Sequence, residues 1–322
     1  SVVVCTASHD RATLLETCVD SLLAGTRRPD ELFVIVDSNP SLKAELAAAL
    51  PESVRLLETE RPGLSEARNV GIQAATSDVV AFVDDDAAGE PQWLSSLMDA
   101  LEADDRVLGV GGPVVPDWGA ERRWLRDELL WIVGCTYRGH REDAGPIRNP
   151  IGCNMAFRRK ELIAVGSFAT GFGKRGNALE TCDETELSLR LERAHGPGRI
   201  RYVPTARVRH FVPASRISWR LLVRRSLSEG LAKGRLHRLY LQPALGPERS
   251  YARGLVVEAV PRLLRDGIRR RDGRFVMGAG AILLSLLITG GAFVAGVFRE
   301  GRRQARLSAG SERHEVGRDA KH

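Results

Sequence analysis

The sequence predicts an α/β fold with a largely parallel sheet in its first 110 residues, and two observations support this. Short runs rich in Val, Ile and Leu alternate there with segments whose apolar residues recur every three to four positions. The first pattern is typical of buried strands and the second of helices that cover a sheet, so their alternation indicates βαβ units. Acidic residues also follow directly after two of the strand-like runs, where open α/β sheets bind their ligands.

The expected elements follow one another in short steps. Strands are predicted over residues 2–6, 32–36, 54–57, 79–83 and 107–110, with helices over 14–23, 64–75 and 93–101. Residues 111–150 are irregular and rich in Gly, Pro and Trp, which fits either a cover over a substrate site or an ordinary packed lid. Further strands are predicted over 154–157, 200–203 and 206–210, around one helix over 184–194.

The chain is predicted to have four parts. They are an α/β domain over 1–212, a basic amphipathic helical region over 213–272, a transmembrane or membrane-embedded segment over 273–299 and a disordered polar tail over 300–322.

The membrane segment rests on the apolar run 275–298, which contains no charge and, at about 1.5 Å per residue, spans about 36 Å. A buried core helix is the alternative. Arginines at 274 and 299 close both ends, which favours two interfaces over a protein interior but leaves the orientation open. The pair Gly290-Gly291 keeps a re-entrant or interfacial hairpin open as well.

Composition excludes several classes of protein. With 43% hydrophobic and 27% charged residues, the chain can bury a large core, unlike a disordered or fibrous protein. The net charge of +6 comes from 47 basic and 41 acidic residues, and the excess in the second half indicates an anionic surface such as membrane lipid nearby. The arginines do not alternate with aromatic residues as in nucleic-acid modules, so no nucleic-acid partner is expected.

The cysteines and the N-terminus indicate the compartment. Five cysteines without a CxxC pair predict reduced thiols and no zinc site. The chain begins with a strand-like run and lacks the pattern of a secretory signal. The α/β domain is therefore expected on the cytoplasmic side of a membrane.

The most specific motif is an apolar strand that ends in three consecutive carboxylates, Asp84, Asp85 and Asp86. Repulsion within such a cluster is offset by a hard divalent cation, which also bridges to phosphate oxygens and stabilises a departing diphosphate. An acidic loop that caps the next helix is the alternative. The position at the carboxyl end of a central strand favours the metal site.

Two polar residues end neighbouring strands. Asp37 follows the strand 32–36 and suits a contact to a base or a ribose hydroxyl, although a turn residue is the alternative. Thr6 ends the first strand and offers a hydroxyl to the same ligand. His210 ends the strand 206–210 and suits a metal ligand, although a lone histidine is more often structural.

A second acidic cluster lies at the start of the helix 184–194. It contains Glu180, Asp183, Glu184 and Glu186. Acids in a first turn favour the helix dipole, which is one explanation of the cluster. The other is a general base, since direct displacement at a sugar carbon requires a carboxylate to take the proton of the attacking hydroxyl.

Taken together, several segments resemble the family 2 glycosyltransferases, which share the GT-A fold, over about residues 1–235. The segments are 2–6 with Arg11, 34–37, 61–71, the Asp-Asp-Asp motif at 84–86, 152–158 and 183–191. The resemblance implies a nucleotide-diphospho-sugar transferase fold, a Rossmann-like mixed sheet flanked by helices. It also implies a nucleotide-binding half over 1–110 and an acceptor half over 111–212.

The resemblance further implies residue roles. Thr6, Asp37 and Arg68 contact the nucleotide, Asp84 and Asp85 lie at the donor, and Asp86 is the principal ligand of Mg²⁺ or Mn²⁺, joined by Asp84 and His210. The family's catalytic pair reads Glu-Asp, whereas this chain reads Asp183-Glu184. Glu184 therefore takes the position of the base, and Asp183 stays in contention.

The expected activity is transfer of one sugar, with inversion, from a nucleotide-diphosphate sugar to an acceptor glycan or lipid-linked acceptor in cell-envelope synthesis. The Gln-x-x-Arg-Trp motif of processive members is absent, because residues 215–219 keep only a loosely similar Arg and Trp. One alternative is a sugar-phosphate nucleotidyltransferase, which is disfavoured because residues 7–11 lack the glycines of a triphosphate-binding loop. The other is a non-catalytic protein that binds a membrane surface.

Overall fold

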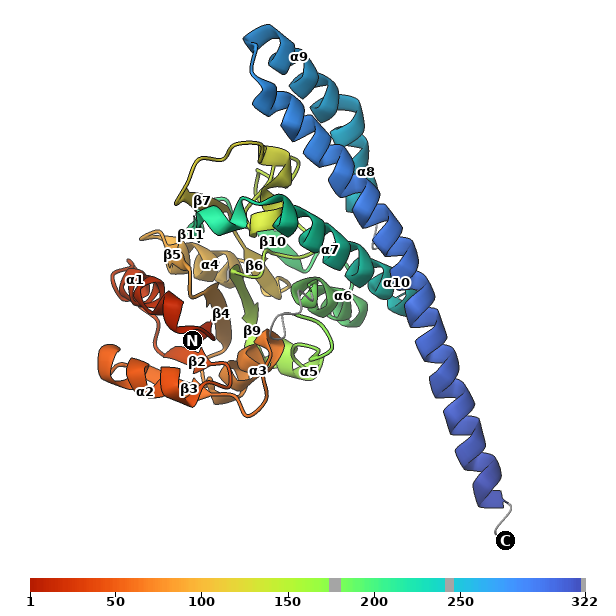
Figure 1. The fold of residues 1–322 in the computed structure, drawn as a ribbon. Coiled ribbons are helices and arrows are strands. Elements are labelled where there is room, and N and C mark those ends of the chain that lie inside the picture. Colours follow the sequence, from red (N-terminus) through yellow and green to blue (C-terminus); the bar gives the residue numbers. More distant parts are fainter. Residues whose placement is uncertain (174–180, 241–245, 320–322) are drawn as a thin grey trace. The chain divides into compact units, whose positions relative to one another are not determined.

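The computed structural model describes residues 1–173, 181–240 and 246–319 of the chain (Figure 1). It divides into two compact units, Ser1–Leu221 and Leu222–His322. The first unit contains both predicted acidic clusters, and the second contains the basic helical region and the apolar run.

The first unit is built on an eight-stranded sheet of order β3-β2-β1-β4-β9-β6-β10-β8. Its strands are β1 (Val2–Thr6), β2 (Leu32–Val36), β3 (Val54–Glu58), β4 (Val79–Asp84), β6 (Gly109–Gly111), β8 (Gly145–Pro146), β9 (Asn154–Arg158) and β10 (Ile200–Tyr202). The first four run parallel, as the βαβ pattern predicts, and β9 pairs antiparallel to β4. The sheet is therefore mixed, and the carboxyl ends of β1, β2 and β4 meet at one edge.

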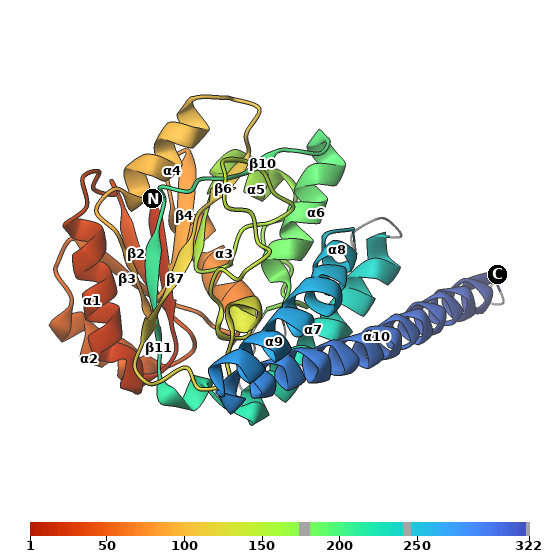
Figure 2. The ribbon, with the colours of Figure 1, turned by 90° about the horizontal axis from the view of Figure 1, so that it is seen from above.

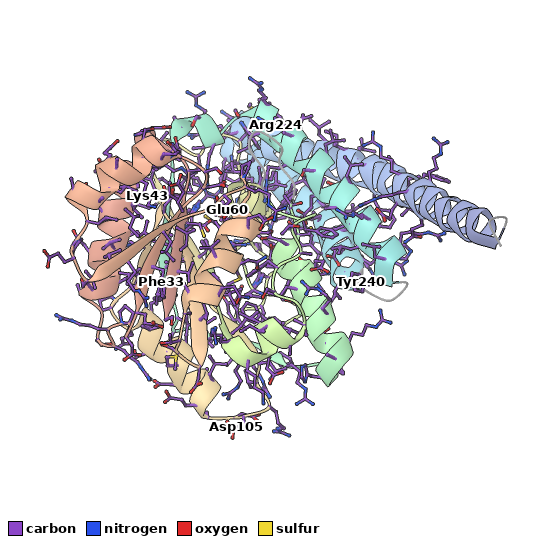
Figure 3. The ribbon with its side chains drawn as sticks, turned by 90° about the horizontal axis from the view of Figure 1, so that it is seen from below. Phe33, Lys43, Glu60, Asp105, Arg224 and Tyr240 are labelled. Carbon is purple, nitrogen blue, oxygen red and sulfur yellow. The ribbon has the colours of Figure 1, made fainter. Side chains whose placement is uncertain are left out.

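Helices cover both faces of this sheet (Figure 2). They are α1 (Ala12–Leu23), α2 (Pro40–Ala49), α3 (Leu64–Ala74), α4 (Trp93–Glu102), α5 (Arg159–Ala164) and α6 (Asp183–His195). Side chains of α3, α5 and α6 form one apolar core with the sheet, in which Phe33 of β2 is fully buried (Figure 3). Alternate residues of each strand face this core, since successive side chains of a strand point to opposite faces.

A smaller sheet adjoins the main one. It has the order β5-β11-β7, with β5 (Ala87–Gly89), β7 (Val114–Trp118) and β11 (Val208–Val212). Because β5 follows the acidic triplet directly and pairs with β11, this sheet brings His210 opposite Ala87. The pairing places a histidine from late in the chain beside the end of β4.

Several element boundaries differ from the predicted ones. The strand expected at 107–110 begins at Gly109, and the strand expected at 206–210 begins at Val208. Helix α2 was not predicted from its periodicity. It begins because Asn39 accepts a hydrogen bond from the Leu42 backbone N–H and Pro40 occupies the first turn, both of which favour a helix start. All five cysteines are free, as expected.

The second unit is helical. It contains most of α7 (Trp219–Tyr240), then α8 (Gly246–Gly254), a π-helical turn at Leu255–Ala259, α9 (Val260–Arg270) and α10 (Gly273–Asp319). The segment Gly273–Gln304 is long and apolar enough to cross a membrane by length and composition. The backbone of α10 is helical through Asp319, so the helix continues into the polar segment 300–322 that the sequence predicted to be disordered.

Close packing of α3 on β1 depends on a glycine. A Cβ atom at Gly71 would lie 2.6 and 2.7 Å from the two methyl carbons of Val3, which is fully buried and has no room to move. We expect Gly71→Ala to lower the free energy of unfolding by about 1–3 kcal/mol despite the better helix propensity of Ala. Thermal or urea unfolding of the full chain measures this.

Gly280→Ala is the matched control, because Gly280 is also helical and has open space around its Cα. It should be neutral or slightly stabilising. Equal stability of the two variants would contradict the tight α3–β1 contact.

Candidate active site

The acidic triplet lies at the carboxyl end of β4, at the edge of the main sheet. Asp84 is the last residue of the strand and is partly exposed, whereas Asp85 and Asp86 are buried in the turn to β5. Buried carboxylates require cationic or hydrogen-bonding partners, because an unpaired buried charge is costly. The partners of the three residues differ, and so do the roles that each can take.

Asp85 is held by the protein itself. Thr6 Oγ1 at the end of β1 donates a hydrogen bond of 2.7 Å to Asp85 Oδ2, and the Arg11 guanidinium pairs with Asp85 Oδ1. Burial raises the pKa of Asp85 to about 6, although Arg11 and Thr6 oppose this shift. Thr6 and Asp85, both predicted to contact the donor, are hydrogen-bonded to each other in the structure, and the donor contacts stay a prediction.

Asp86 is surrounded by cationic groups. Its Oδ2 lies 3.1 Å from Arg11 Nη2 and 3.2 Å from Arg216 Nη2, and its Oδ1 lies 3.2 Å from His210 Nε2. Burial acts to raise the pKa of Asp86, but His210 and the two arginines outweigh it and hold the pKa below its ordinary range. Burial likewise acts to lower the pKa of His210, and Asp86 raises it to about 10.

Three side chains at this edge fit a divalent cation. One ligand atom each from Asp84, Asp86 and His210 lies within 4.8 Å of the others, and these oxygen and imidazole ligands suit Mn²⁺ or Mg²⁺. The buried Asp86 Oδ1 lies 3.2 Å from His210 Nε2, so two of the three candidate ligand atoms are already in contact with each other. Cys135 Sγ lies 3.8 Å from the opposite ring nitrogen, Nδ1, of His210.

Arg68 connects the two acidic clusters. It is buried in α3, and its guanidinium lies 2.5 Å from Asp183 Oδ2, 2.9 Å from the Gly152 carbonyl and 3.7 Å from Asp84 Oδ1. Arg68 therefore joins the end of β4 to the start of α6. In the structure its charge is balanced by two carboxylates of the protein, and its predicted contact to the nucleotide stays a prediction.

Asp183 and Glu184 open α6 and lie in different surroundings. Asp183 is buried and paired with Arg68, whereas Glu184 is only half-buried. Burial and the neighbouring Asp183 raise the pKa of Glu184 well above its ordinary value, against the opposing charge of Arg68. A carboxylate that is partly accessible and has a raised pKa suits a general base. Glu180 lies outside the described residues.

Asp37 organises a loop at the same edge. Its Oδ1 accepts hydrogen bonds from the Gly63 backbone N–H at 2.8 Å and from Thr59 Oγ1 at 3.3 Å. These bonds tie the end of β2 to the start of α3. Asp37, Asp84 and Thr6 lie at the ends of β2, β4 and β1, which are neighbouring parallel strands, so these residues follow the same edge of the sheet.

The sequence reasoning missed two arginines. Arg11 and Arg216 flank Asp86 from the 3₁₀ turns His9–Arg11 and Ala214–Arg216. Arg216 Nη1 also lies 3.2 Å from His210 Nε2. Two signals were present in the sequence: Arg11 belongs to a segment that carries the family resemblance, and each arginine lies a few residues beyond a strand.

Comparison with solved structures places the fold among the GT-A glycosyltransferases. A mannosyltransferase from Pyrobaculum calidifontis, solved with GDP-Man and Mn²⁺, superposes with a TM-score of 0.57 at 18% identity, over 89% of this chain and 86% of that one. GalNAc-T7, solved with UDP, GalNAc and Mn²⁺, gives a TM-score of 0.52 at 16% identity over 78% of this chain. The chain spans about half of that longer structure, 53%.

The chain belongs to glycosyl transferase family 2, whose family model matches residues 1–166. A glucosyl-dolichyl phosphate glucuronosyltransferase from Haloferax volcanii is 34% identical over 274 residues, covering 83% of this chain and 87% of the relative. Succinoglycan biosynthesis protein ExoM from Rhizobium meliloti is 27% identical over 246 residues, covering 72% and 73%. The chain is thus a glycosyltransferase that uses nucleotide-sugar donors, which removes the two alternative functions.

The candidate metal ligands generate a prediction about donor binding. We expect Asp86→Ala to abolish the Mn²⁺-dependent part of the affinity for a nucleoside diphosphate, because it removes the carboxylate that faces His210. Isothermal titration with UDP and GDP, with Mn²⁺ and with a chelator, measures that difference. Asp78→Ala is the matched control, since Asp78 is exposed just before the opposite end of β4. Equal Mn²⁺ dependence in Asp86→Ala and the parent would refute the metal role.

Proposed function

We propose that this glycosyltransferase transfers a single sugar, with inversion and with a divalent metal, from a nucleoside-diphosphate sugar to a lipid-linked sugar at the cytoplasmic face of a membrane. The observation that carries the proposal is the chain of contacts from His210 and Asp86 to Asp84, through Arg68, to Asp183 and Glu184. This chain of contacts supports a cation site and a carboxylate base on two sides of one buried arginine.

The residues divide the chemistry between them. Asp84, Asp86 and His210 would hold the cation, which when bound stabilises the charge of a departing diphosphate. Arg11 and Arg216 bring further positive charge to the same place, where a diphosphate would need it.

Glu184 is the proposed base. It would take the proton of the attacking acceptor hydroxyl as the new glycosidic bond forms and the bond to the diphosphate breaks. Asp183 and Arg68 hold the start of α6 in place, so that the Glu184 carboxylate keeps its position. One base and one displacement give inversion at the sugar carbon.

The acceptor class is inferred from relatives and from the second unit. The Haloferax volcanii relative is named for a glucosyl-dolichyl phosphate acceptor, and the chain aligns with most of that protein. Among the described residues, one helix is long and apolar enough for a membrane. Both observations support a polyprenyl-phosphate-linked sugar as acceptor, with a nucleoside-diphosphate hexuronic acid as the first donor to test.

The base assignment is tested by Glu184→Gln, which keeps the shape of the side chain but cannot accept a proton. We expect donor affinity to stay within about twofold and the transfer rate to fall by about 10²–10⁴-fold. Product formation on a polyprenyl-phosphate-linked glucose, followed by mass spectrometry, measures the rate, and the anomeric configuration by NMR tests inversion. If Glu184→Gln transfers sugar at the normal rate while Asp183→Asn folds but is inactive, the base is Asp183 and not Glu184.

The raised pKa of Glu184 sets the direction of a pH effect. Because burial and Asp183 raise that pKa above the ordinary 4.5, the ionised base is lost as the pH falls through a value well above 4.5. The acid limb of the transfer rate should therefore lie above the range of an exposed glutamate. The residual activity of Glu184→Gln should lack this limb. If the parent and Glu184→Gln show the same acid limb, the titrating group is not Glu184.

A further inference from the structure

The apolar helix α10 does not stand alone in the second unit, because charged helices lie along it. Helices α8 and α9, joined by the π-helical turn, form one continuous helical stretch over residues 246–270, and α9 doubles back on the start of α10. A Cβ atom at Gly267 would lie 3.0 Å from a methyl carbon of Val276, and the Arg270 guanidinium lies over the Phe275 ring. Figure 1 shows α9 running beside the first part of α10.

Helix α7 covers the later part of α10. Ser226 and Ser285 share a hydrogen bond of 2.9 Å, and Arg235 pairs with Glu300 at 3.4 Å. Between these contacts Gly230 and Gly234 lie so close to the α10 backbone that a Cβ atom at either position would clash with it. The direction of α7 in Figure 3 is marked by Arg224 and Tyr240.

Both helices that contact α10 are too polar for a hydrocarbon interior. Residues 246–270 carry charges along their length, among them Arg249, Arg253, Glu258, Arg262, Arg265 and Asp266. Helix α7 carries Arg224, Arg225, Glu229, Lys233, Arg235 and Arg238. If α10 crossed a bilayer while keeping these contacts, both sets of charges would lie at hydrocarbon depth, which membranes disfavour strongly.

The flanks of α10 give a second, independent reason against a crossing. Arg269, Arg270, Arg271 and Arg274 precede the apolar run, and Arg299, Arg302 and Arg303 follow it. A spanning helix places its two ends on opposite sides, and only the cytoplasmic side is normally rich in Lys and Arg. Basic residues at both ends are explained if both ends lie on the same anionic surface.

Helix α10 nevertheless leaves one apolar stripe uncovered. Val276, Leu283, Leu287, Val294 and Phe298 recur along one side of the helix and are exposed, Leu287 to 75% and Phe298 to 67%. Residues between them, such as Ile282 and Ala292, are buried against the rest of the unit. On α9, Ile268 is 78% exposed beside Arg269. Apolar side chains next to arginines are typical of helices that lie in an anionic membrane interface.

We infer that α10 lies in the plane of one leaflet of an anionic membrane, with its exposed stripe in the lipid, and does not cross to the other side. This rests on the membrane location in the proposed function and decides how the chain is attached. The catalytic unit and the C-terminus then lie on the same side, where a lipid-linked acceptor would present its sugar.

The test is the side on which each terminus lies. The full chain with one epitope at the N-terminus and a different one at the C-terminus is prepared in inside-out membrane vesicles and in intact spheroplasts, and both are treated with protease. We expect both epitopes to be cut in the inside-out vesicles and both to be protected in the spheroplasts. Protection of one epitope and loss of the other in the same preparation would overturn the inference.

A second measurement uses purified full chain and flotation with phosphatidylcholine vesicles, with and without phosphatidylglycerol. Leu287→Glu should lower the floated fraction on the order of fivefold, because it places a charge in the lipid-facing stripe. Ile163→Glu is the matched control, since Ile163 is an exposed apolar residue of α5 in the first unit. Unchanged flotation of folded Leu287→Glu, or no flotation of the parent, would also overturn the inference.

Charge reversal at the two flanks separates the in-plane arrangement from a crossing. Arg269→Glu and Arg299→Glu should each lower binding to phosphatidylglycerol vesicles by on the order of fivefold or more, because both ends contact one surface. An effect of only one of them would contradict the arrangement. Donor turnover in detergent is measured in parallel. If the parent chain shows no donor turnover, the proposed function is contradicted. The flotation result does not depend on turnover and still tests the in-plane arrangement.

Discussion

The structure of the catalytic unit depends on the neutralisation of buried carboxylates at the end of β4. Asp85 and Asp86 are buried there, and Asp84 lies beside them. Isolated buried charges of this kind would be expensive, so each has a cationic partner: Arg11, Arg68, Arg216 or His210. These partners come from four separate segments, and satisfying the carboxylates therefore holds those segments together.

The same network separates supporting residues from reacting ones. Arg11 neutralises the charge of Asp85, and Arg68 neutralises that of Asp183. These two ion pairs hold the end of β4 and the first turn of α6 in position. Asp86 belongs to the group of three candidate metal ligands, and Glu184 is half-buried with a raised pKa. These are the two carboxylates to which the proposed function assigns the cation and the proton.

The proposed mode of attachment to a membrane depends on how the helices are combined in the second unit. Helix α10 by itself satisfies the length and hydropathy of a membrane span. Its contacts with α7 and α9, both rich in arginine, change the environment in which that helix can be stable. An apolar helix that shares its buried side with charged helices is suited to an interface, where one side meets lipid and the other meets water.

Features that depend on near neighbours can be predicted from the amino-acid sequence alone. They are the strand 79–83 with its three acids, the parallel βαβ order, the helix after Asp183 and the apolar run, all of which follow from local periodicity. The pairing of charges is known only from the folded chain, because those pairs join distant positions: Arg68 and Asp183 are 115 residues apart, and Arg11 and Asp85 are 74 apart. Local patterns carry no information on which distant residues come into contact. Those contacts depend on the order of the strands in the sheet and on the need to neutralise buried charges. For that reason the carboxylate partners of Thr6 and Arg68 were not predicted, and the contact of Arg216 with Asp86 could not be found from its own segment.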